Sequence, residues 1–467
     1  MKSKTVSRGI LYYIFLLIAV VVGVLCIIGA ILLLSPGTEI FGISYYNRFD
    51  TTNITTVADE NQQSYEIDQL FDSGRVDVVN VTTNHADVTI QNRESVRIQF
   101  FIEGAVTGIV TSENKNSFNY SISYSAQTRT LNLDVTAPIL LLTFNNSMEV
   151  VLSLPYEFVD TNIDFVVNTQ SGDVSVGNHE RDTYTLNSLT VNAENSSNVL
   201  LGNHANVKNE INLNVPSGEI RFNTDVVTGE LNITSESARI RTSDIEAQNV
   251  KLVTQGSSVN MNNIQGNFDY SARRGVIIVG DITGNLTCSE EVVIANITVG
   301  TVDGNVILPN AESSNITIEA LNGRGDITTT SGNVTIRSAN AILEVQTQSG
   351  KIDVTVDTNP TLITGGYEEE LGVINLETQS GEIAINFANV YLQNYITTTS
   401  GTINCAFSAS NNLVLSYDCT NNAPTLSTGI TTGEVQNQGE YTIGNSSTRN
   451  KITINNTDGR TSVSDTY

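Results

Sequence analysis

A short phrase that recurs along the chain constrains its fold more than any other feature. It reads Ser-Gly, a polar residue, an aliphatic residue, any residue and a second aliphatic residue, as at residues 349–354. Glycine permits a backbone turn that a residue with a Cβ resists, and the alternation places the aliphatic side chains on one face of a strand. We therefore predict short strands that follow glycine corners. The predicted corner glycines are Gly172, Gly218, Gly332, Gly350, Gly381 and Gly401.

The spacing of the corners predicts how these strands are arranged. Spacings are irregular, often near 9–10 or 18–21 residues. This fits a coil with two or three short strands per turn, whose aliphatic side chains are covered by the neighbouring coils. The predicted fold class is all-β, with an N-terminal transmembrane helix followed by a β-solenoid (β-helix-like) ectodomain. A β-sandwich with many hairpins is the alternative.

The N-terminus has the composition of a membrane anchor. Lys2, Lys4 and Arg8 precede an apolar run over residues 10–34 that contains no charged residue. A helix of this length spans roughly 37 Å, which exceeds the hydrocarbon core of a bilayer at about 30 Å. We predict a signal-anchor helix at residues 10–34, a cytoplasmic tail at residues 1–9 and an extracellular remainder, because basic flanks stay inside. A cleaved signal peptide is the alternative.

The rest of the chain divides into three predicted segments. Residues 35–70 are polar and are predicted to be a juxtamembrane linker. Residues 71–155 are predicted to be an N-terminal β region or a cap of the solenoid, and residues 156–467 the β-solenoid repeat domain. Within the second segment, the apolar run at residues 137–144 is too short to span a bilayer as a helix, so we expect a buried strand or part of the cap.

The charge balance narrows the range of partners. The chain has 49 acidic and 23 basic residues and a net charge of −26. Such a surface repels phosphate backbones and anionic lipid headgroups, so we predict no nucleic-acid partner. The predicted partners are the membrane, crossed once, and either a surface carbohydrate or another surface protein.

The sequence offers little chemistry for catalysis or metal binding. Cys405 and Cys419 could form a disulfide, or could be two unpaired small core residues, and both alternatives stay open. No zinc, nucleotide-binding or nucleophile motif is present, so we predict no catalytic residue, cofactor or metal. The three histidines are His85, His179 and His204. Five acids lie near glycine corners, and we expect them to form hydrogen bonds within turns. They are Asp173, Asp281, Asp303, Asp326 and Asp353.

Triplets of the form Asn-x-Ser/Thr are frequent. In a eukaryotic secreted chain they would be glycan acceptors, although many arise by chance in a chain this rich in Asn, Ser and Thr. They are therefore compatible with an exposed glycoprotein without requiring one. They begin at Asn53, Asn80, Asn119, Asn145, Asn195, Asn232, Asn285, Asn296, Asn315, Asn333, Asn445 and Asn455.

The order of these features is similar to that of a known family. A membrane helix precedes a first strand at residues 73–78, and a later strand at residues 150–155 leads into Thr-x-Ser-Gly copies. This order resembles the bacterial membrane-anchored β-strand-repeat surface proteins called "putative adhesins", a domain of unknown function. The resemblance covers about residues 71–467 and implies a surface β-solenoid without catalytic residues. The chain departs from it in its long array and in irregular inserts such as residues 365–370.

The anchor and the repeats together predict a surface protein at the cell membrane. Its expected role is structural or adhesive, with no catalysis. Two alternatives are an envelope-stress or signalling accessory protein and a polysaccharide-active β-helix enzyme. The second would need carboxylates clustered on one face of the solenoid.

Overall fold

The structure, a computed structural model, confirms the all-β class. It describes residues 4–34, 39–40, 43–93, 97–111, 118–155, 162–177, 184–202, 205–288, 294–340, 342–357, 373–427, 429–430, 435–444 and 449–465. The chain forms two compact units. Unit 1 is Met1–Phe158 with Ile163–Asp182, and unit 2 is Val159–Asn162 with Thr183–Tyr467.

Unit 1 begins with the apolar helix α1, Lys4–Leu34. Its window Tyr12–Ile31 has a mean hydropathy of 3.3 and is 0% buried, so by length and composition alone it could cross a membrane or serve as a signal sequence. The other elements of unit 1 are β1 (Glu39–Ile40), β2 (Ile43–Ile54), β3 (Thr56–Ala58), β4 (Ser64–Glu66), α2 (Ile67–Asp72), β5 (Val78–Thr83), β6 (Asp87–Arg93), β7 (Gln99–Thr111), β8 (Asn119–Ser125), β9 (Thr130–Thr136), β10 (Leu142–Asn146), β11 (Glu149–Pro155), β12 (Asp164–Thr169) and β13 (Val174–Val176).

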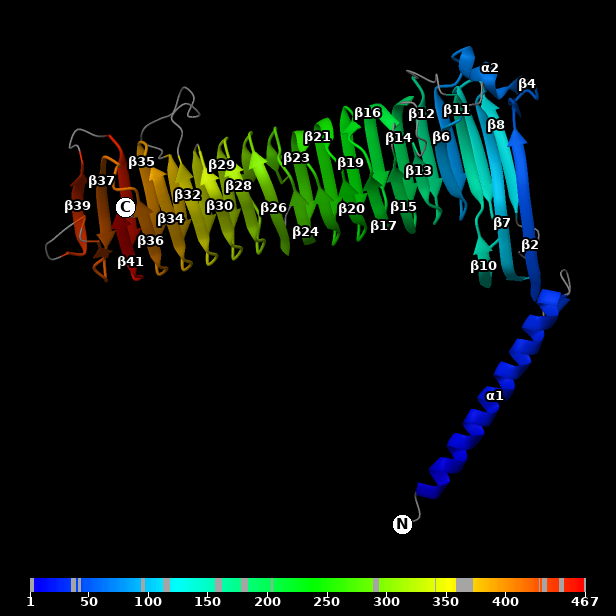
Figure 1. The fold of residues 1–467 in the computed structure, drawn as a ribbon, viewed down its shortest axis with the longest axis horizontal. Coiled ribbons are helices and arrows are strands. Elements are labelled where there is room, and N and C mark those ends of the chain that lie inside the picture. Colours follow the sequence, from blue (N-terminus) through cyan, green and yellow to red (C-terminus); the bar gives the residue numbers. More distant parts are fainter. Residues whose placement is uncertain are drawn as a thin grey trace. The chain divides into compact units, whose positions relative to one another are not determined.

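Strand pairing in unit 1 is mixed. Strands β2, β7 and β11 pair antiparallel in that order, whereas β6 pairs parallel with both β11 and β13. On the other side, β8 pairs antiparallel with β9, and β5 pairs parallel with both β9 and β12. Figure 1 shows β2, β7 and β10 side by side. The core lies between these two sets of strands and includes Phe100, Leu131 and Phe165.

Two predicted boundaries are wrong. The segment predicted as a linker at residues 35–70 contributes β2, whose Ser44 and Tyr46 are buried, and most of α2, whose Ile67 and Leu70 are buried. Its Thr and Asn residues are typical of a linker, but threonine and tyrosine also suit a strand with one solvated face. The boundary at residues 155 and 156 also fails, because β12 and β13 pair with β5 and β6 inside unit 1.

The apolar run at residues 137–144 is largely exposed. Ala137 is buried, but Ile139 and Leu141 are each 62% exposed and Phe144 is 50% exposed. The expectation of a buried strand is therefore wrong for most of this run. Strand β10 is instead an outer strand that pairs antiparallel with β7.

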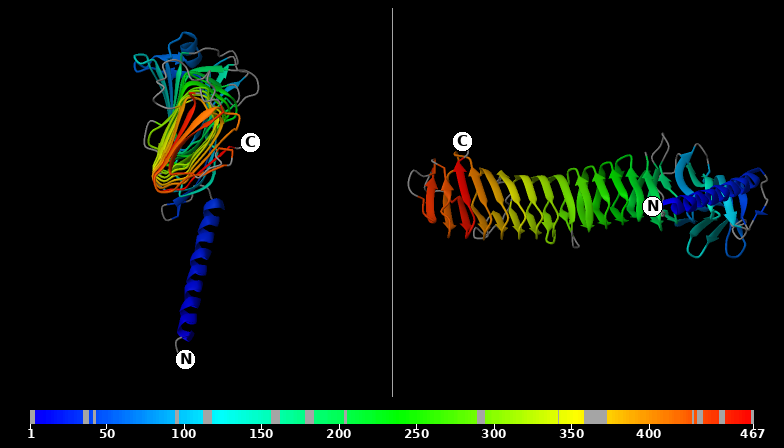
Figure 2. Two further views of the ribbon diagram at one scale, coloured as in Figure 1. Left: turned by 90° about the vertical axis from the view of Figure 1, so that its left-hand side faces the viewer. Right: turned by 90° about the horizontal axis from the view of Figure 1, so that it is seen from below.

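Unit 2 is a stack of coils (Figure 1). Each coil contributes one principal strand to each of two columns of strands. The left view of Figure 2 looks along this stack, where successive coils superpose as flattened loops. One column contains β15 (Ser196–Leu201), β17 (Ser217–Phe222), β20 (Arg239–Thr242), β22 (Ser258–Met261), β24 (Arg274–Val279), β26 (Ile294–Val302), β28 (Ile316–Leu321), β30 (Val334–Ala339), β32 (Ile352–Asp357), β34 (Ile383–Asn389), β36 (Ile403–Phe407), β38 (Thr425–Leu426) and β41 (Thr461–Asp465).

The second column has longer strands at its start. It contains β14 (Tyr184–Ala193), β16 (Ala205–Asn214), β18 (Val226–Val227), β19 (Glu230–Ser235), β21 (Ile245–Thr254), β23 (Ile264–Ala272), β25 (Leu286–Thr287), β27 (Val306–Leu308), β29 (Gly325–Thr329), β31 (Leu343–Thr347), β33 (Ile374–Thr378), β35 (Gln393–Thr398), β37 (Leu413–Cys419), β39 (Gln438–Ile443) and β40 (Lys451–Asn456). Two principal strands per coil is the lower of the two predicted numbers.

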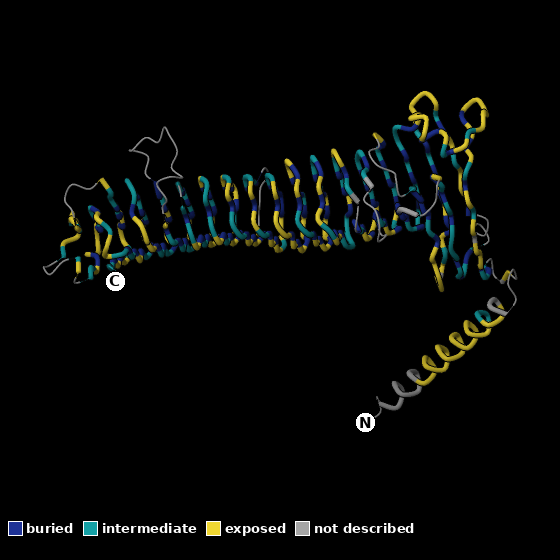
Figure 3. The backbone as a smooth tube through the Cα atoms, turned by 45° about the horizontal axis from the view of Figure 1, so that its top comes forward, coloured by how far each residue is buried: buried dark blue, intermediate teal, exposed yellow. Residues whose placement is uncertain are grey.

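The core of unit 2 is a ladder of aliphatic side chains. Val334, Ile352, Ile383 and Ile403 pair in sequence along one column, and each is 0% exposed. Burying each such side chain contributes about 1.5–3 kcal/mol. Most outward positions are polar, which gives the alternation of buried and exposed residues seen in Figure 3. A shift by one residue would turn the whole ladder outward, so the alternation fixes the register.

The corner of the recurring phrase is explained by two contacts. A buried threonine ends one strand, and its Oγ1 accepts a hydrogen bond from the glycine N–H three residues later, as from Gly350 to Thr347 at 2.9 Å. A Cβ on Gly350 would also overlap the carbonyl oxygen of Gly332 in the coil before it. Gly381 stacks on Gly350 in the same way, and Gly401 on Gly381. The glycines are thus required for close approach between coils.

The sequence suggested that the corners need glycine for an unusual backbone turn, and that reason is wrong for most of them. Of the predicted glycines, Gly218 alone has a left-handed backbone, with φ +110°, and it too lies against a carbonyl, that of Ser197. Gly172 and Gly332 lie against the carbonyls of Ala86 and Ser314. The sequence pattern therefore identified the right positions, and the main constraint at them is space.

The C-terminal coil is out of sequence order. Strand β40 pairs parallel with both β35 and β37, and β41 pairs parallel with both β36 and β38. The coil of β40 and β41 therefore lies between two coils that precede it in the chain. Strand β39 then pairs antiparallel with the other edge of β37. An antiparallel final strand departs from the coil pattern and covers an edge that would otherwise template further pairing.

Candidate binding surfaces

Polar side chains on the outer face of unit 2 form ladders that run from coil to coil. Asn267 Nδ2 donates to Asn249 Oδ1 at 3.0 Å, and Asn285 Nδ2 donates to Asn267 Oδ1 at 3.1 Å. Asn296 and Asn315 form a second ladder, with Nδ2 of Asn315 donating at 2.9 Å. These amides are already bonded to one another, so the ladders stabilise the stack itself.

The ladders also account for Asn-x-Ser/Thr triplets in the coils of unit 2. Within strands the pattern places asparagine outward, an aliphatic residue inward and threonine outward, as at residues 333–335. Asn333 Oδ1 accepts a hydrogen bond from the N–H of Lys351 at 2.9 Å, one coil later. The strand pattern thus produces such triplets for a structural reason. Glycosylation of any of them stays a prediction.

The acids singled out beside the corners take structural bonds. Asp281 Oδ1 accepts from the N–H of Thr301 at 2.6 Å, and Asp303 Oδ1 accepts from Asn322 Nδ2 at 2.7 Å. Asp353 forms an ion pair with Lys351 at 3.1 Å, and Asp326 lies opposite Glu344 in the register of β29 and β31. Hydrogen bonding between coils is therefore the observed role of Asp281 and Asp303.

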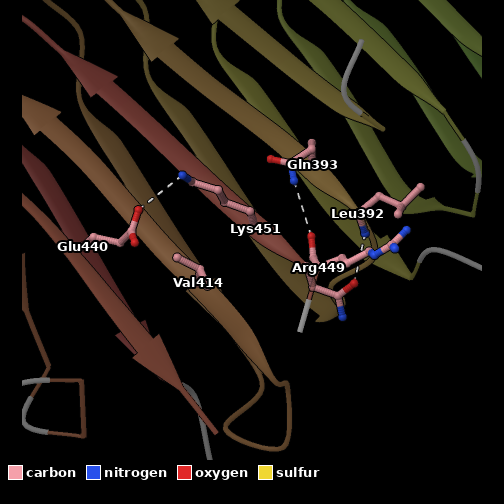
Figure 4. A pocket seen from close by; sticks show the side chains of 7 residues that line it. Leu392, Gln393, Val414, Glu440, Arg449 and Lys451 are labelled. Atoms are coloured by element: carbon pink, nitrogen blue, oxygen red, sulfur yellow. Dashed lines mark hydrogen bonds and ion pairs between the residues drawn. The ribbon is translucent and has the colours of Figure 1, made fainter. Parts of the chain in front are cut away.

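A pocket of about 520 Å³ lies at the C-terminal coils of unit 2, where β40 lies between β35 and β37 (Figure 4). Lys451 Nζ lies 3.3 Å from Glu440 Oε2 across it, and Gln393 Nε2 donates to the carbonyl of Arg449 at 3.3 Å. Its volume is in the range of small-molecule sites, and its lining is mostly polar. The full lining is Leu392, Gln393, Val414, Glu440, Arg449, Asn450 and Lys451.

Backbone strain marks the same pocket. Leu392 has a φ of +52°, which is unusual for a bulky residue. Its N–H donates to Asn450 Oδ1 at 3.1 Å, and its carbonyl accepts from the N–H of Lys451 at 2.8 Å. The inserted strand β40 therefore holds Leu392 in this conformation. No sequence pattern signalled this pocket, because it depends on pairing that is out of chain order.

A second pocket, of about 480 Å³, lies in unit 1 beside the first Ser-Gly corner. His85 Nδ1 lies 2.6 Å from Ser171 Oγ, and Asp87 Oδ1 accepts from the N–H of Asp173 at 2.8 Å. Ile139 supplies an apolar side of the pocket. The arrangement combines two carboxylates, an imidazole and an aliphatic surface, which suits a polar or cationic group with an apolar part.

Electrostatics in this pocket disfavour a charged Asp87. Desolvation raises the pKa of its carboxyl above the ordinary value, and the nearby carboxylates of Asp173 and Glu149 raise it further. The hydrogen bond from the Asp173 backbone acts in the opposite direction and lowers it. Of these residues, sequence analysis singled out His85 and Asp173, but it did not bring them together.

The structure agrees with the second of the two alternatives for the cysteines, which is a pair of unpaired small core residues. Cys405 lies in β36 opposite Val463, Cys419 lies in β37 opposite Asn456, and both are buried free thiols. The disulfide alternative is therefore absent from the structure. Burial raises the pKa of Cys405 to about 12 and also raises that of Cys419, so neither thiol is suited to act as a thiolate.

No group of three or more metal-ligating side chains occurs among the residues that the structure describes. Of the histidines, His179 and His204 fall outside those residues, as does the acidic insert at residues 365–370.

Comparison with known proteins identifies a family for most of the chain. The model of the Toastrack domain DUF4097 matches residues 76–464. A search of curated proteins found no match.

Solved structures give low-scoring similarities. A "putative adhesin" of Parabacteroides distasonis is 10% identical with a TM-score of 0.26, covering 66% of this chain and 97% of that one. A "putative adhesin" of Parabacteroides merdae is 13% identical with a TM-score of 0.24, covering 66% and 95%. A "putative cell adhesion protein" of Clostridium sporogenes is 9% identical with a TM-score of 0.17, covering 90% and 100%.

Proposed function

This chain belongs to the Toastrack family DUF4097, and from that premise we propose that it is a single-pass surface protein with a structural or binding role. Helix α1 anchors it in the cell membrane, with residues 1–9 in the cytoplasm and both β units outside. The observation that carries the proposal is the exposure of α1: within the described residues, nothing covers the window Tyr12–Ile31. A helix that is apolar on all sides needs a lipid environment or removal as a signal sequence.

The structural part of the role is supported by the wall of unit 2. Its outward amides bond to the next coil, as between Asn305 N–H and Asn285 Oδ1 at 2.8 Å. A wall built in this way is stiff, because each coil is held to its neighbours by backbone pairing, an aliphatic ladder and a polar ladder. Such a stack can present a repeating polar face to a surface carbohydrate or to another surface protein.

Protease treatment of intact cells tests the topology. We expect added protease to remove the chain beyond residue 38, while an epitope tag fused before Met1 stays protected until the cells are lysed. If both units stay intact on unlysed cells, the proposed orientation is wrong. A mature protein that lacks residues 1–34 by mass spectrometry would instead identify α1 as a cleaved signal peptide.

The ligand is tested by a binding screen. We expect the full chain in detergent or nanodiscs to bind members of a glycan array or of a panel of surface proteins. The matched variant is Arg449→Gln with Lys451→Gln, which removes both cations of the pocket in Figure 4. Loss of binding in this variant would place the ligand at the pocket in Figure 4, and unchanged binding would leave the wall of unit 2 or the pocket of unit 1.

The two alternatives from the sequence remain predictions with tests of their own. Co-purification of a membrane sensor with the full chain would favour the envelope-stress accessory role. Release of sugar products from a polysaccharide would favour the enzyme.

A further inference from the structure

The outer face of unit 1 has an apolar cluster at the end of its sheet. We call Tyr45, Ile109, Leu141 and Phe144 the apolar edge. Leu141 is 62% exposed and Phe144 is 50% exposed, whereas Tyr45 and Ile109 are half-buried. Large exposed side chains that gather in this way mark an interaction surface more often than single exposed residues do.

Strand pairing brings these residues together. Tyr45 in β2 lies opposite Ile109 in β7, and Leu142 in β10 lies opposite Ile109 from the other side. The N–H of Leu141 donates to the carbonyl of Ile109 at 2.7 Å. The rings of Tyr45 and Phe144 have centroids 6.3 Å apart. Three strands therefore contribute to one continuous apolar surface.

The apolar edge is at the end of unit 1 that is tied to the anchor. Helix α1 ends at Leu34, and Glu39 in β1 already pairs with Ser44 in β2. Five peptide steps separate Leu34 from Glu39, which limits that distance to about 17 Å. Tyr45 directly follows Ser44, so the edge lies within a short distance of the membrane surface if α1 spans the bilayer.

We propose that the apolar edge inserts into the headgroup region of the same bilayer that holds α1. This inference rests on the proposed membrane anchoring. Tyrosine suits that region because it combines an apolar ring with a polar hydroxyl, and phenylalanine and leucine bury their apolar side chains at the headgroup–acyl boundary. The net charge of −26 disfavours anionic headgroups, so the lipid is a zwitterionic one such as phosphatidylcholine. The contact fixes unit 1 against the membrane by a second point besides α1.

The absence of tryptophan from the sequence gives a direct test. The variant Phe144→Trp places a single indole on the apolar edge of the full chain, reconstituted in phosphatidylcholine vesicles. The matched control is Gln63→Trp, an exposed position in the turn between β3 and β4. That turn follows the far end of β2, and Ile54 is about 30 Å along the strand from Tyr45.

Replacing the lipid with phosphatidylcholine brominated near the headgroup should quench Phe144→Trp at least about twofold, as expected for a side chain about 5–10 Å deep at the headgroup–acyl boundary. Gln63→Trp should be unaffected. A protein that floats with the vesicles but shows no quenching of Phe144→Trp retains its anchor and overturns the inference. Equal quenching of both variants also overturns it, because the contact would not be specific to this edge.

Two further outcomes separate this inference from its premise. If the full chain does not float with vesicles, the anchor itself fails and the inference fails with it. If the emission of Phe144→Trp shifts with protein concentration but not with lipid bromination, a second copy of the chain covers the edge in place of lipid, which contradicts the proposal.

Discussion

Units 1 and 2 are built from the same alternating strands, yet their strands find partners in different ways. In unit 2, Asn267 and Asn285 are 18 residues apart and bond one coil to the next. In unit 1, the equivalent amide bond from Asn168 to Asn80 joins residues 88 apart. Closing a longer loop costs more entropy, although the cost rises slowly with length. A short recurring motif can therefore specify a stack of coils, but it cannot specify a sheet whose paired strands are far apart in the sequence.

The largest expected effect is on the glycine column of unit 2. Gly350→Ala places a Cβ against the carbonyl oxygen of Gly332, and a backbone atom cannot move aside as a side chain can. We expect a loss of about 3 kcal/mol in the free energy of unfolding, at the upper end for overpacking. Urea unfolding measures it, and hydrogen exchange should rise in β30, β32 and β34 but not in unit 1.

The matched control for that change is Gly256→Ala. Its nearest neighbour would be the carbonyl oxygen of Glu236 at 3.7 Å, an ordinary contact. We expect a change of no more than about 0.5 kcal/mol. Equal losses in the two variants would show that glycine is needed for chain flexibility and not for close approach between coils.

A smaller effect is expected from the threonine of the same corner. Thr347→Val keeps the side-chain volume but removes the oxygen that accepts from the N–H of Gly350, and that N–H is buried. Leaving a buried donor without a partner costs about 1–3 kcal/mol. The control Thr355→Val changes an outward position of β32, where the free energy of unfolding should stay nearly constant. A loss no larger at Thr347 than at Thr355 would remove the corner hydrogen bond from this account.

The smallest effect is expected in unit 1, from Asp87→Asn. The folded pKa of Asp87 is raised, so the folded state holds its proton more tightly than the unfolded state does. The free energy of unfolding therefore falls as the pH rises from the pKa of Asp87 in the unfolded state toward its raised pKa in the folded state. At pH 7 the variant should be slightly more stable than the unchanged protein, and the gain should vanish below about pH 4, near the ordinary pKa of an aspartate. Thermal denaturation at both pH values measures this.

The control for the pH effect is Asp134→Asn, at an exposed position of β9. It should show no comparable gain at pH 7. A gain for Asp87→Asn that persists at low pH would mean that ionisation of Asp87 is not its cause.

The sequence correctly predicts features that depend on residues close together in the chain. The corners at Gly350 and Gly381 and the inward Val and Ile positions follow from spacing and alternation. The linker predicted at residues 35–70 is wrong for residues 43–54, because their polar face is visible in the sequence while their distant partner, β7, is not. The pocket at Leu392 was missed for a similar reason, because β40 reaches it from 58 residues away.

Two engineered cysteines test most directly whether the phrase sets the coil register. Thr335 in β30 lies opposite Asp353 in β32, and both are outward positions. Neighbouring strands are about 4.8 Å apart, which is within the range of Cα separations that a disulfide can join. The double variant Thr335→Cys with Asp353→Cys should form its engineered disulfide far faster on oxidation than the double variant Thr335→Cys with Thr355→Cys. Peptide mass spectrometry follows both reactions. Equal rates, or faster closure of the second pair, would contradict the register on which the account depends.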